Sequence, residues 1–138
     1  MILSFTGTRA GMTAKQVFVV KSLLDELQPS CVIHGDCIGA DTEFHKIVEY
    51  RRGLFGHHPI IKIYPSTAKT RANNDGDIIM PQKPPLERDI DIAREGDRLI
   101  ATPKEMAEVL RSGTWTTIRK AKKLGKIVYV VLPDGEIK

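Results

Sequence analysis

Short apolar segments alternate with amphipathic ones along nearly the whole chain, and this alternation restricts the fold more than any other feature. Five segments rich in β-branched and aromatic residues predict strands, namely 2–7, 31–35, 60–65, 98–103 and 127–133. The last, IVYVVLP, has almost no polar alternation, which is typical of a parallel strand covered on both faces. Strands that alternate with helices through short links predict an α/β protein of three layers, with a parallel sheet of about five strands.

Four helices are expected between these strands, one between Thr13 and Pro29, one from Ala40 to near Gly53, one at about 86–95 and one at roughly 114–124. The first opens with a capping-box pattern, in which Thr13 and Gln16 each satisfy a backbone N–H of the other, and Pro29 ends it. The stretch 66–85 is polar and proline-rich, and we expect an irregular loop that is either functional or mobile. The 138 residues contain no repeat or boundary, so we expect one domain, 1–138.

Composition excludes several classes of protein. Apolar residues make up 41% of the chain and charged residues 28%, which is typical of a globular protein. No apolar run reaches the length of a membrane span, and no signal segment opens the chain, so we expect a cytoplasmic protein without membrane contact. The net charge of +4 favours anionic ligands, but it is too small to indicate nucleic acid by itself.

Small and hydrogen-bonding residues gather after three of the predicted strands. They are Gly7, Thr8 and Arg9, then Gly35, Asp36, Gly39, Ala40 and Asp41, and finally Ser112, Gly113 and Thr114. The carboxyl ends of the strands in an open parallel sheet meet at a switch point where ligands bind. Glycine lets backbone N–H groups approach a phosphate, and a following helix N-terminus adds unpaired N–H groups. The turns therefore predict a phosphate site with the Thr114 and Thr117 hydroxyls as further donors, although the same residues also begin ordinary helices.

Two nucleotide-binding signatures are absent from the sequence. It contains neither G-x-x-x-x-G-K-[ST] nor G-x-G-x-x-G, so a P-loop NTPase or a standard NAD dehydrogenase is not expected. A possible metal cluster lies within twelve residues and comprises His34, Asp36, Cys37, Asp41 and His45. Its spacing matches no known ligand set, so we expect neither a metal nor a cofactor.

The order of four motifs resembles the SLOG superfamily, which joins the DNA-processing protein DprA, the LOG phosphoribohydrolases and the YspA/YpsA-type proteins. The motifs are TGTR, HGDCIGAD, PLERDIDIAREGDRLIA and SGTWTTIRKAKKLGK, and the resemblance covers nearly the whole chain apart from 66–85 and 104–111. The chain looks most like the small stand-alone YspA-like branch. The resemblance implies a Rossmann-like fold, a nucleotide-type ligand held by the three turns, and Arg88 in the same pocket. Asp89 replaces the asparagine that is usual in this branch.

One departure from the superfamily bears on catalysis. LOG-type enzymes carry a glutamate shortly after their phosphate turn, and Thr116 and Thr117 stand where it would be expected. Without that carboxylate, cleavage of an N-glycosidic bond lacks its main group. We therefore expect a sensor or sequestering protein that binds an ADP-ribose-like or NAD-derived molecule through phosphate and ribose, with Arg88 giving a bidentate phosphate contact.

Two alternatives remain open, and so does the question of whether the protein is an enzyme. A nucleotide N-glycosidase or phosphohydrolase could use Asp36, Asp41, Glu43 and Arg88. A DprA-like DNA-binding module is disfavoured because aromatic residues make up only 6% of the chain, and the basic run 119–123 is expected to be a solvated face.

Oligomerisation and one aromatic residue complete the expectations. Members of the superfamily often pair, so we expect a homodimer or tetramer in which 66–85 closes a neighbour's pocket as a lid. Trp115 is expected to pack in the core rather than to stack on a base.

Overall fold

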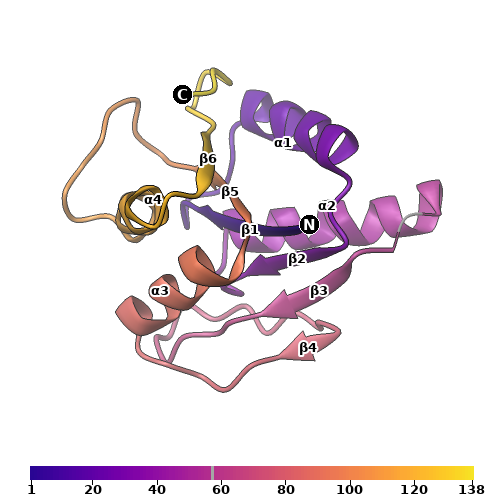
Figure 1. Cartoon of the computed structure of the whole chain (residues 1–138), viewed down its shortest axis with the longest axis horizontal. Coiled ribbons are helices and arrows are strands. Elements are labelled where there is room, and N and C mark those ends of the chain that lie inside the picture. Colours follow the sequence, from indigo (N-terminus) through magenta and orange to yellow (C-terminus); the bar gives the residue numbers. More distant parts are fainter. Residues whose placement is uncertain (57) are drawn as a thin grey trace.

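A six-stranded parallel sheet forms the centre of the computed structural model, which describes residues 1–56 and 58–138 (Figure 1). Its order is β4-β3-β2-β1-β5-β6. The strands are β1 (Ile2–Gly7), β2 (Cys31–His34), β3 (Ile60–Ile63), β4 (Ile78–Ile79), β5 (Arg98–Thr102) and β6 (Ile127–Val130). The predicted parallel α/β sheet is confirmed. The sixth strand, β4, lies in the stretch 66–85 that we expected to be irregular.

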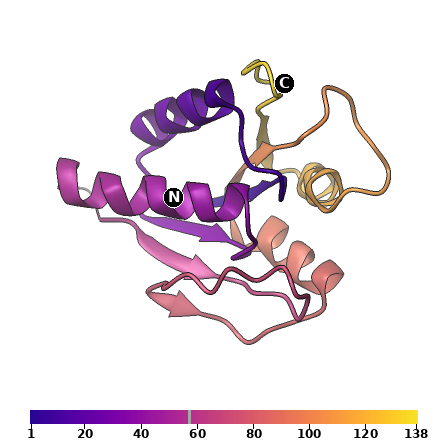
Figure 2. The same ribbon diagram turned by 180° about the vertical axis from the view of Figure 1, so that it is seen from behind.

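Helices cover both faces of the sheet. They are α1 (Ala14–Leu27), α2 (Ala40–Phe55), α3 (Pro85–Glu95) and α4 (Gly113–Lys123). Figures 1 and 2 show α1 and α2 on one face and α3 and α4 on the other, which confirms the three layers. In the described residues, no helix combines the length and the apolar character that crossing a membrane requires.

The capping box at the start of α1 is present and does more than cap the helix. Thr13 Oγ1 accepts a hydrogen bond from Gln16 N at 3.1 Å, and Gln16 Oε1 accepts one from Thr13 N at 2.9 Å. The Gln16 amide also donates to the carbonyls of Pro103 and Val131, both at 2.9 Å. A buried polar side chain is thereby fully used, and it ties α1 to the chain segments that follow β5 and β6.

The side chains of β1 point alternately to the two faces of the sheet and so contact the core on both sides. Leu3 and Phe5 are buried in the cluster shared with α1 and α2, and Phe5 stacks on Phe44 with ring centroids 4.2 Å apart. Ser4 points to the other face, where its hydroxyl donates to Ile92 O of α3 at 2.7 Å. Because successive strand residues face opposite sides, β1 anchors a helix layer on each face.

The strand segment 127–133 is typical in sequence of a strand covered on both faces, but it is partly uncovered at the edge of the sheet beyond β5. Ile127 is 51% exposed, and so is Leu124, which precedes this strand. The reason is that β6 pairs only with β5, and Leu124 is the residue that ends α4, outside its buried stripe. Trp115 does pack in the core, beside Ile118 and Leu132.

The order of the strands creates a switch point between β1 and β5. From β1 the chain moves outward through β2, β3 and β4, and then returns to the opposite side of β1 as β5 and β6. Gly7 and Thr102, the last residues of β1 and β5, are register partners. Connections that leave in opposite directions cannot fill the space above these two strand ends, which is where such sheets bind ligands.

Candidate functional site

A hollow of about 440 Å³ opens at the carboxyl ends of β1 and β5. Its size falls within the range of about 300–1,000 Å³ that is common for small-molecule sites. Eight of the residues selected from the sequence line it, namely Gly7, Thr8, Arg9, Asp41, Arg88, Ser112, Gly113 and Thr114. The hollow therefore brings together side chains and turns that lie more than 100 residues apart in the sequence.

Five further selected residues lie behind this lining and shape it. Three of them act through the backbone. A side chain at Gly39, where φ is +88°, would strike the backbone of Arg9. Ala40 N donates to Thr8 O at 3.0 Å, and Gly35 O accepts from Arg88 Nη1 at 2.8 Å. The remaining two are Thr117 and Asp36.

Thr117 does not offer its hydroxyl to the hollow. The side chain is fully buried, and Oγ1 donates to Gly113 O at 2.9 Å within α4. The expected role of this hydroxyl as a ligand donor is therefore wrong. The bond instead holds the carbonyl of Gly113, the first residue of α4.

The first turn of α4 presents two unpaired N–H groups to the hollow. Ser112 caps the helix, because its hydroxyl accepts from Trp115 N at 3.2 Å. The N–H groups of Gly113 and Thr114 have no acceptor within residues 1–56 and 58–138, and both residues line the hollow. Unpaired N–H groups at a helix start carry partial positive charge and can hold an anion.

A basic rim, which we define as Arg9, Lys104 and Arg111, adds positive charge to the same hollow. All three residues are exposed and line it. Sequence reasoning selected Arg9 but missed the other two, because 104–111 was set aside as an insertion. The segment arches outward between β5 and α4 (Figure 1). Its position directly after a strand's carboxyl end was the signal that could have identified it.

Contacts with α4 hold this outward segment in place. Trp115 Nε1 donates to Glu105 Oε1 at 2.9 Å, and Arg119 Nη1 donates to Glu108 Oε2 at 2.7 Å and to Val109 O at 3.2 Å. The basic run of α4 thus contributes an anchor for the loop. The segment that carries Lys104 and Arg111 is therefore attached at both of its ends.

Arg88 lines the hollow, but its guanidinium is already largely occupied. Nε donates to Asp89 Oδ1 at 2.9 Å, and Nη1 donates to Gly35 O at 2.8 Å and Tyr64 O at 3.3 Å. Nη2 lies 3.6 Å from Cys37 Sγ. Of the five N–H groups of an arginine, only one is left. The expected bidentate phosphate contact is therefore not available without breaking bonds that hold the ends of β2 and β3.

Asp41 stands in the first turn of α2 with an incompletely paired carboxylate. The residue is 5% exposed, and Oδ2 accepts from Cys37 N at 3.1 Å. Oδ1 has no hydrogen-bond partner in the described part of the chain. Burial raises the pKa of this carboxyl to about 6, although the Cys37 N–H and the Arg88 charge oppose the shift. Perturbed, underpaired acids of this kind are concentrated at functional sites.

Asp36 clamps the segment 70–74 against the end of β2. Its buried carboxylate accepts from Arg71 Nε at 3.0 Å and from the backbone N–H groups of Asn73 and Asn74 at 3.1 and 2.9 Å. Asn74 Nδ2 donates to the same carboxylate at 2.9 Å. Asp36 itself has a φ of +58°, which a non-glycine residue keeps only when surrounding contacts enforce it.

The clamped segment forms a wall of the hollow in its own chain. Ser66, Ala68 and Thr70 line the hollow, and Thr70 O accepts from Ile38 N at 2.9 Å. A homo-oligomer in which 66–85 closes a neighbour's pocket stays a prediction, while within this chain Arg71, Asn73 and Asn74 bind Asp36. Because these residues occupy it, the Asp36 carboxylate is not presented to a ligand.

We predict that Asp36→Asn loosens this wall. The amide cannot accept four hydrogen bonds or pair with Arg71, so the free energy of unfolding should fall by about 2–4 kcal/mol. Amide hydrogen exchange at Asn73 and Asn74 should accelerate. The change is checked by urea unfolding and by exchange followed with NMR. Asp75→Asn, an exposed neighbour in the same segment, is the matched control, and an Asp36→Asn protein as stable as this control would contradict the clamp.

Two buried histidines form a hydrogen-bonded pair beneath the turn after β2. His34 Nε2 lies 2.9 Å from His45 Nδ1, and Asp36 N donates to His34 Nδ1 at 2.9 Å. Because Nδ1 accepts, the neutral form of His34 carries its proton on Nε2 and donates it to His45. Burial, followed by the neighbouring His45, lowers the pKa of His34 to about 3. Within residues 1–56 and 58–138, no three His, Cys, Asp or Glu side chains are placed to hold a metal.

The His34 pair predicts a pH-dependent stability. The unfolded chain takes up a proton on His34 below about pH 6.5, whereas the folded chain, with His45 and Arg88 near this ring, keeps it neutral down to about 3. The neutral His34 ring therefore contributes fully to the free energy of unfolding above about pH 6.5. Between about pH 6.5 and pH 3 this contribution falls by up to about 1.4 kcal/mol per pH unit.

His34→Gln removes this titration. Its stability deficit relative to wild type should therefore shrink by about 2–3 kcal/mol between pH 7 and 4.5, measured by urea unfolding. His58→Gln, which removes an exposed histidine, is the control. A deficit for His34→Gln that stays constant over this range would show that the ring protonates freely in the folded state.

Comparisons with known proteins identify the fold but not the family. No family model matches the chain, and no curated protein matches its sequence. A solved structure of similar fold is that of the molybdenum cofactor binding protein from the phototrophic bacterium Rippkaea orientalis, with a TM-score of 0.69 and 15% identity. The match covers 95% of this chain and 76% of the other. At this identity the likeness shows a shared Rossmann-like α/β fold.

Proposed function

We propose that the hollow binds a nucleotide or nucleotide-derived ligand, ADP-ribose-like or NAD-derived, through its phosphate and ribose. The protein would act as a sensor or sequestering protein and would be a divergent member of the SLOG superfamily. The observation that carries the proposal is the pair of unpaired N–H groups at Gly113 and Thr114, beside the basic rim, in a hollow of about 440 Å³. Backbone N–H groups and basic side chains together are the usual means of holding a phosphate.

The Asp41–Arg88–Asp89 cluster limits how far the phosphate can enter. Asp89 Oδ2 lies 3.9 Å from the position that a Cβ of Gly113 would take. A phosphate pushed toward this carboxylate would be repelled, and Arg88 offsets only part of that charge because it is shared among four partners. The favourable position for a phosphate is therefore on the outer side of Gly113 and Thr114, toward Lys104 and Arg111.

The carboxylates available for catalysis favour binding over turnover. Glu43 is outside the hollow, where Oε1 accepts from Met12 N at 2.6 Å. Asp36 is fully occupied by the segment 70–74, and Glu105 accepts from Trp115. Among the described residues that line the hollow, Asp41 is the acid with an unpaired, buried oxygen. The enzymatic alternative would rest on this residue.

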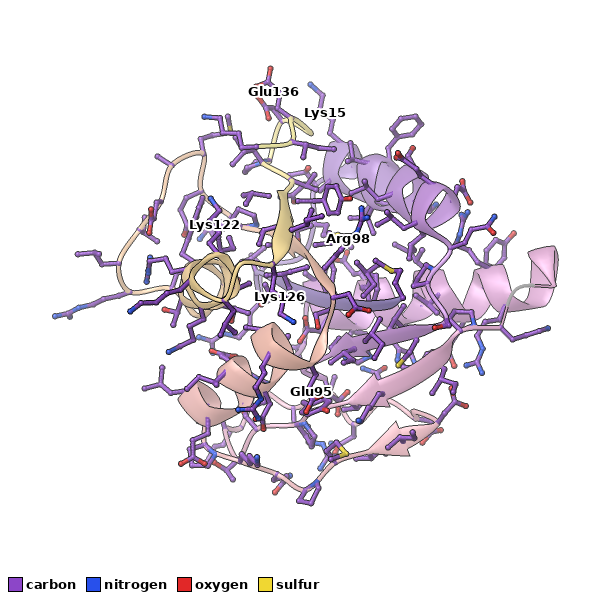
Figure 3. All side chains as sticks on the ribbon, viewed as in Figure 1. Lys15, Glu95, Arg98, Lys122, Lys126 and Glu136 are labelled. Carbon is purple, nitrogen blue, oxygen red and sulfur yellow. The ribbon has the colours of Figure 1, made fainter. Side chains whose placement is uncertain are left out.

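Two further observations bear on the choice of ligand. The structural neighbour is described as a molybdenum cofactor binding protein, which supports a small-molecule site on this fold. Lys122, in the last turn of α4, and Lys126, which directly precedes β6, are labelled in Figure 3, and neither lines the hollow. Their charge does not extend the basic rim into a groove, so the DNA-binding alternative remains disfavoured.

Removal of two of the three residues of the basic rim tests the phosphate contact. The double variant Lys104→Ala/Arg111→Ala should weaken binding of ADP-ribose by about 1–3 kcal/mol, because two charge-assisted contacts are lost. Isothermal titration calorimetry at fixed salt measures the effect. Lys122→Ala/Lys123→Ala makes the same change in net charge at the far end of α4 and should bind like wild type. Equal losses in both double variants would mean that only net charge matters and would refute a specific contact.

Incubation with candidate substrates separates a binder from an enzyme. AMP, ADP-ribose, NAD and cyclic nucleotides should release no base or phosphate above background, as measured by chromatography. At least one of them should raise the melting temperature, because a ligand that binds only the folded state stabilises it. Release that disappears in Asp41→Asn would replace the binder with an enzyme. The molybdenum cofactor belongs in the same melting series, and stabilisation by it alone would replace the nucleotide.

A further inference from the structure

The inner end of the hollow carries negative charge, in contrast to its rim. Asp41 and Asp89 both line it and are 5% and 7% exposed. The Arg88 guanidinium lies between them, because Nε binds Asp89 Oδ1 while its other end and Asp41 Oδ2 both pack against Gly35. Two carboxylates and one guanidinium leave a formal charge of −1. We call Asp41, Arg88 and Asp89 the acidic floor.

The acidic floor retains hydrogen-bond acceptors that the protein does not use. Asp41 Oδ1 is buried and has no partner in the described part of the chain. Oδ2 of Asp89 makes no hydrogen bond there either, since Arg88 is bound through Oδ1. A carboxylate oxygen buried without a donor destabilises a fold, and native proteins contain few of them. Asp41 Oδ1 is an oxygen of this kind, so a donor group that reaches it from the inner end of the hollow would supply the partner that it lacks.

Chemistry restricts what this donor can be. An ionised carboxylate only accepts hydrogen bonds, so a phosphate or carboxylate of a ligand would be repelled. A neutral hydroxyl or amino group can donate to it, and charged acceptors make the stronger bonds. A nucleotide contains both kinds of group, namely the ribose hydroxyls and the amino groups of the base, at a distance from its phosphate.

We infer that the acidic floor is a second subsite, in which Asp41 and Asp89 accept hydrogen bonds from hydroxyl or amino groups of the ligand whose phosphate the basic rim holds. The inference rests on the proposed function and specifies which end of the ligand is anionic and which end carries neutral hydrogen-bond donors. A molecule with an anion at one end and neutral donors at the other fits the hollow in one orientation. A molecule that is anionic at both ends does not fit.

Matched nucleotides and one isosteric variant test the subsite. Binding of AMP, 2′-deoxy-AMP, 3′-deoxy-AMP and IMP is measured by calorimetry on wild type, Asp41→Asn and Asp134→Asn. The last variant removes an exposed aspartate outside the hollow and controls for net charge. Wild type should prefer AMP over at least one analogue by about 10- to 100-fold, the value of a lost hydrogen bond to a charged group. Asp41→Asn should reduce that preference to less than about threefold, and Asp134→Asn should keep it.

The pattern of loss identifies the source of the donor. A preference against the deoxy analogues that disappears in Asp41→Asn places the ribose at the acidic floor, and one against IMP places the amino group of the base there. Nucleotides that bind wild type without either preference, or with a preference that Asp41→Asn keeps, overturn the subsite but leave the proposed function intact. Failure of every nucleotide to bind wild type overturns both.

The melting temperature of Asp41→Asn without ligand distinguishes a ligand-binding carboxylate from one that serves only the fold. The asparagine carbonyl can keep the bond from Cys37 N, and a neutral amide removes the cost of burying a charge. The melting temperature of Asp41→Asn at pH 8 should therefore equal or exceed that of wild type while ligand discrimination is lost. A lower melting temperature with unchanged discrimination would show that Asp41 serves the fold alone.

Discussion

The hollow depends on the hydrogen bonds that the Arg88 guanidinium makes. It holds the carbonyls of Gly35 and Tyr64, at the ends of β2 and β3, and joins them to Asp89 at the start of α3. A buried cation needs both a counter-charge and acceptors for its N–H groups, and here strand ends supply the acceptors while Asp89 supplies the charge. This requirement gives a physical reason for the aspartate at position 89.

A second buried charge, Asp36, accepts hydrogen bonds, whereas Arg88 donates them. Arg88 satisfies carbonyls at the strand ends, whereas Asp36 satisfies the N–H groups of the segment that walls the hollow. Irregular backbone near a site exposes both kinds of group, and neither can remain buried and unpaired. The two charges thus fix the walls in advance, while Asp41 Oδ1 and the N–H groups of Gly113 and Thr114 stay unpaired within the described part of the chain. These are the groups that a ligand can satisfy.

The sequence predicted what depends on local periodicity and missed what depends on distant contacts. The parallel strands and the Thr13–Gln16 capping box are encoded within a few residues, and both are present. β4 is only two residues long, too short to leave a periodic signal. The glycine turns predicted where the hollow lies, because strand ends converge in any open parallel sheet. The use of Asp36 and Arg88 could not be predicted, because all hydrogen-bond partners of their side chains except Asp89 lie 24 to 53 residues away.

The central claim is that one hollow, above β1 and β5, holds a nucleotide by its phosphate and its donor groups. Titration of ¹⁵N-labelled protein with AMP and ADP-ribose, followed by NMR, tests it most directly. The largest and saturable shifts should fall on the amides of Gly113, Thr114, Thr8 and Asp41, while those at the far end of α4, around Lys122, stay in place. Saturable shifts that cluster elsewhere, or an unchanged spectrum at millimolar nucleotide, would contradict the account.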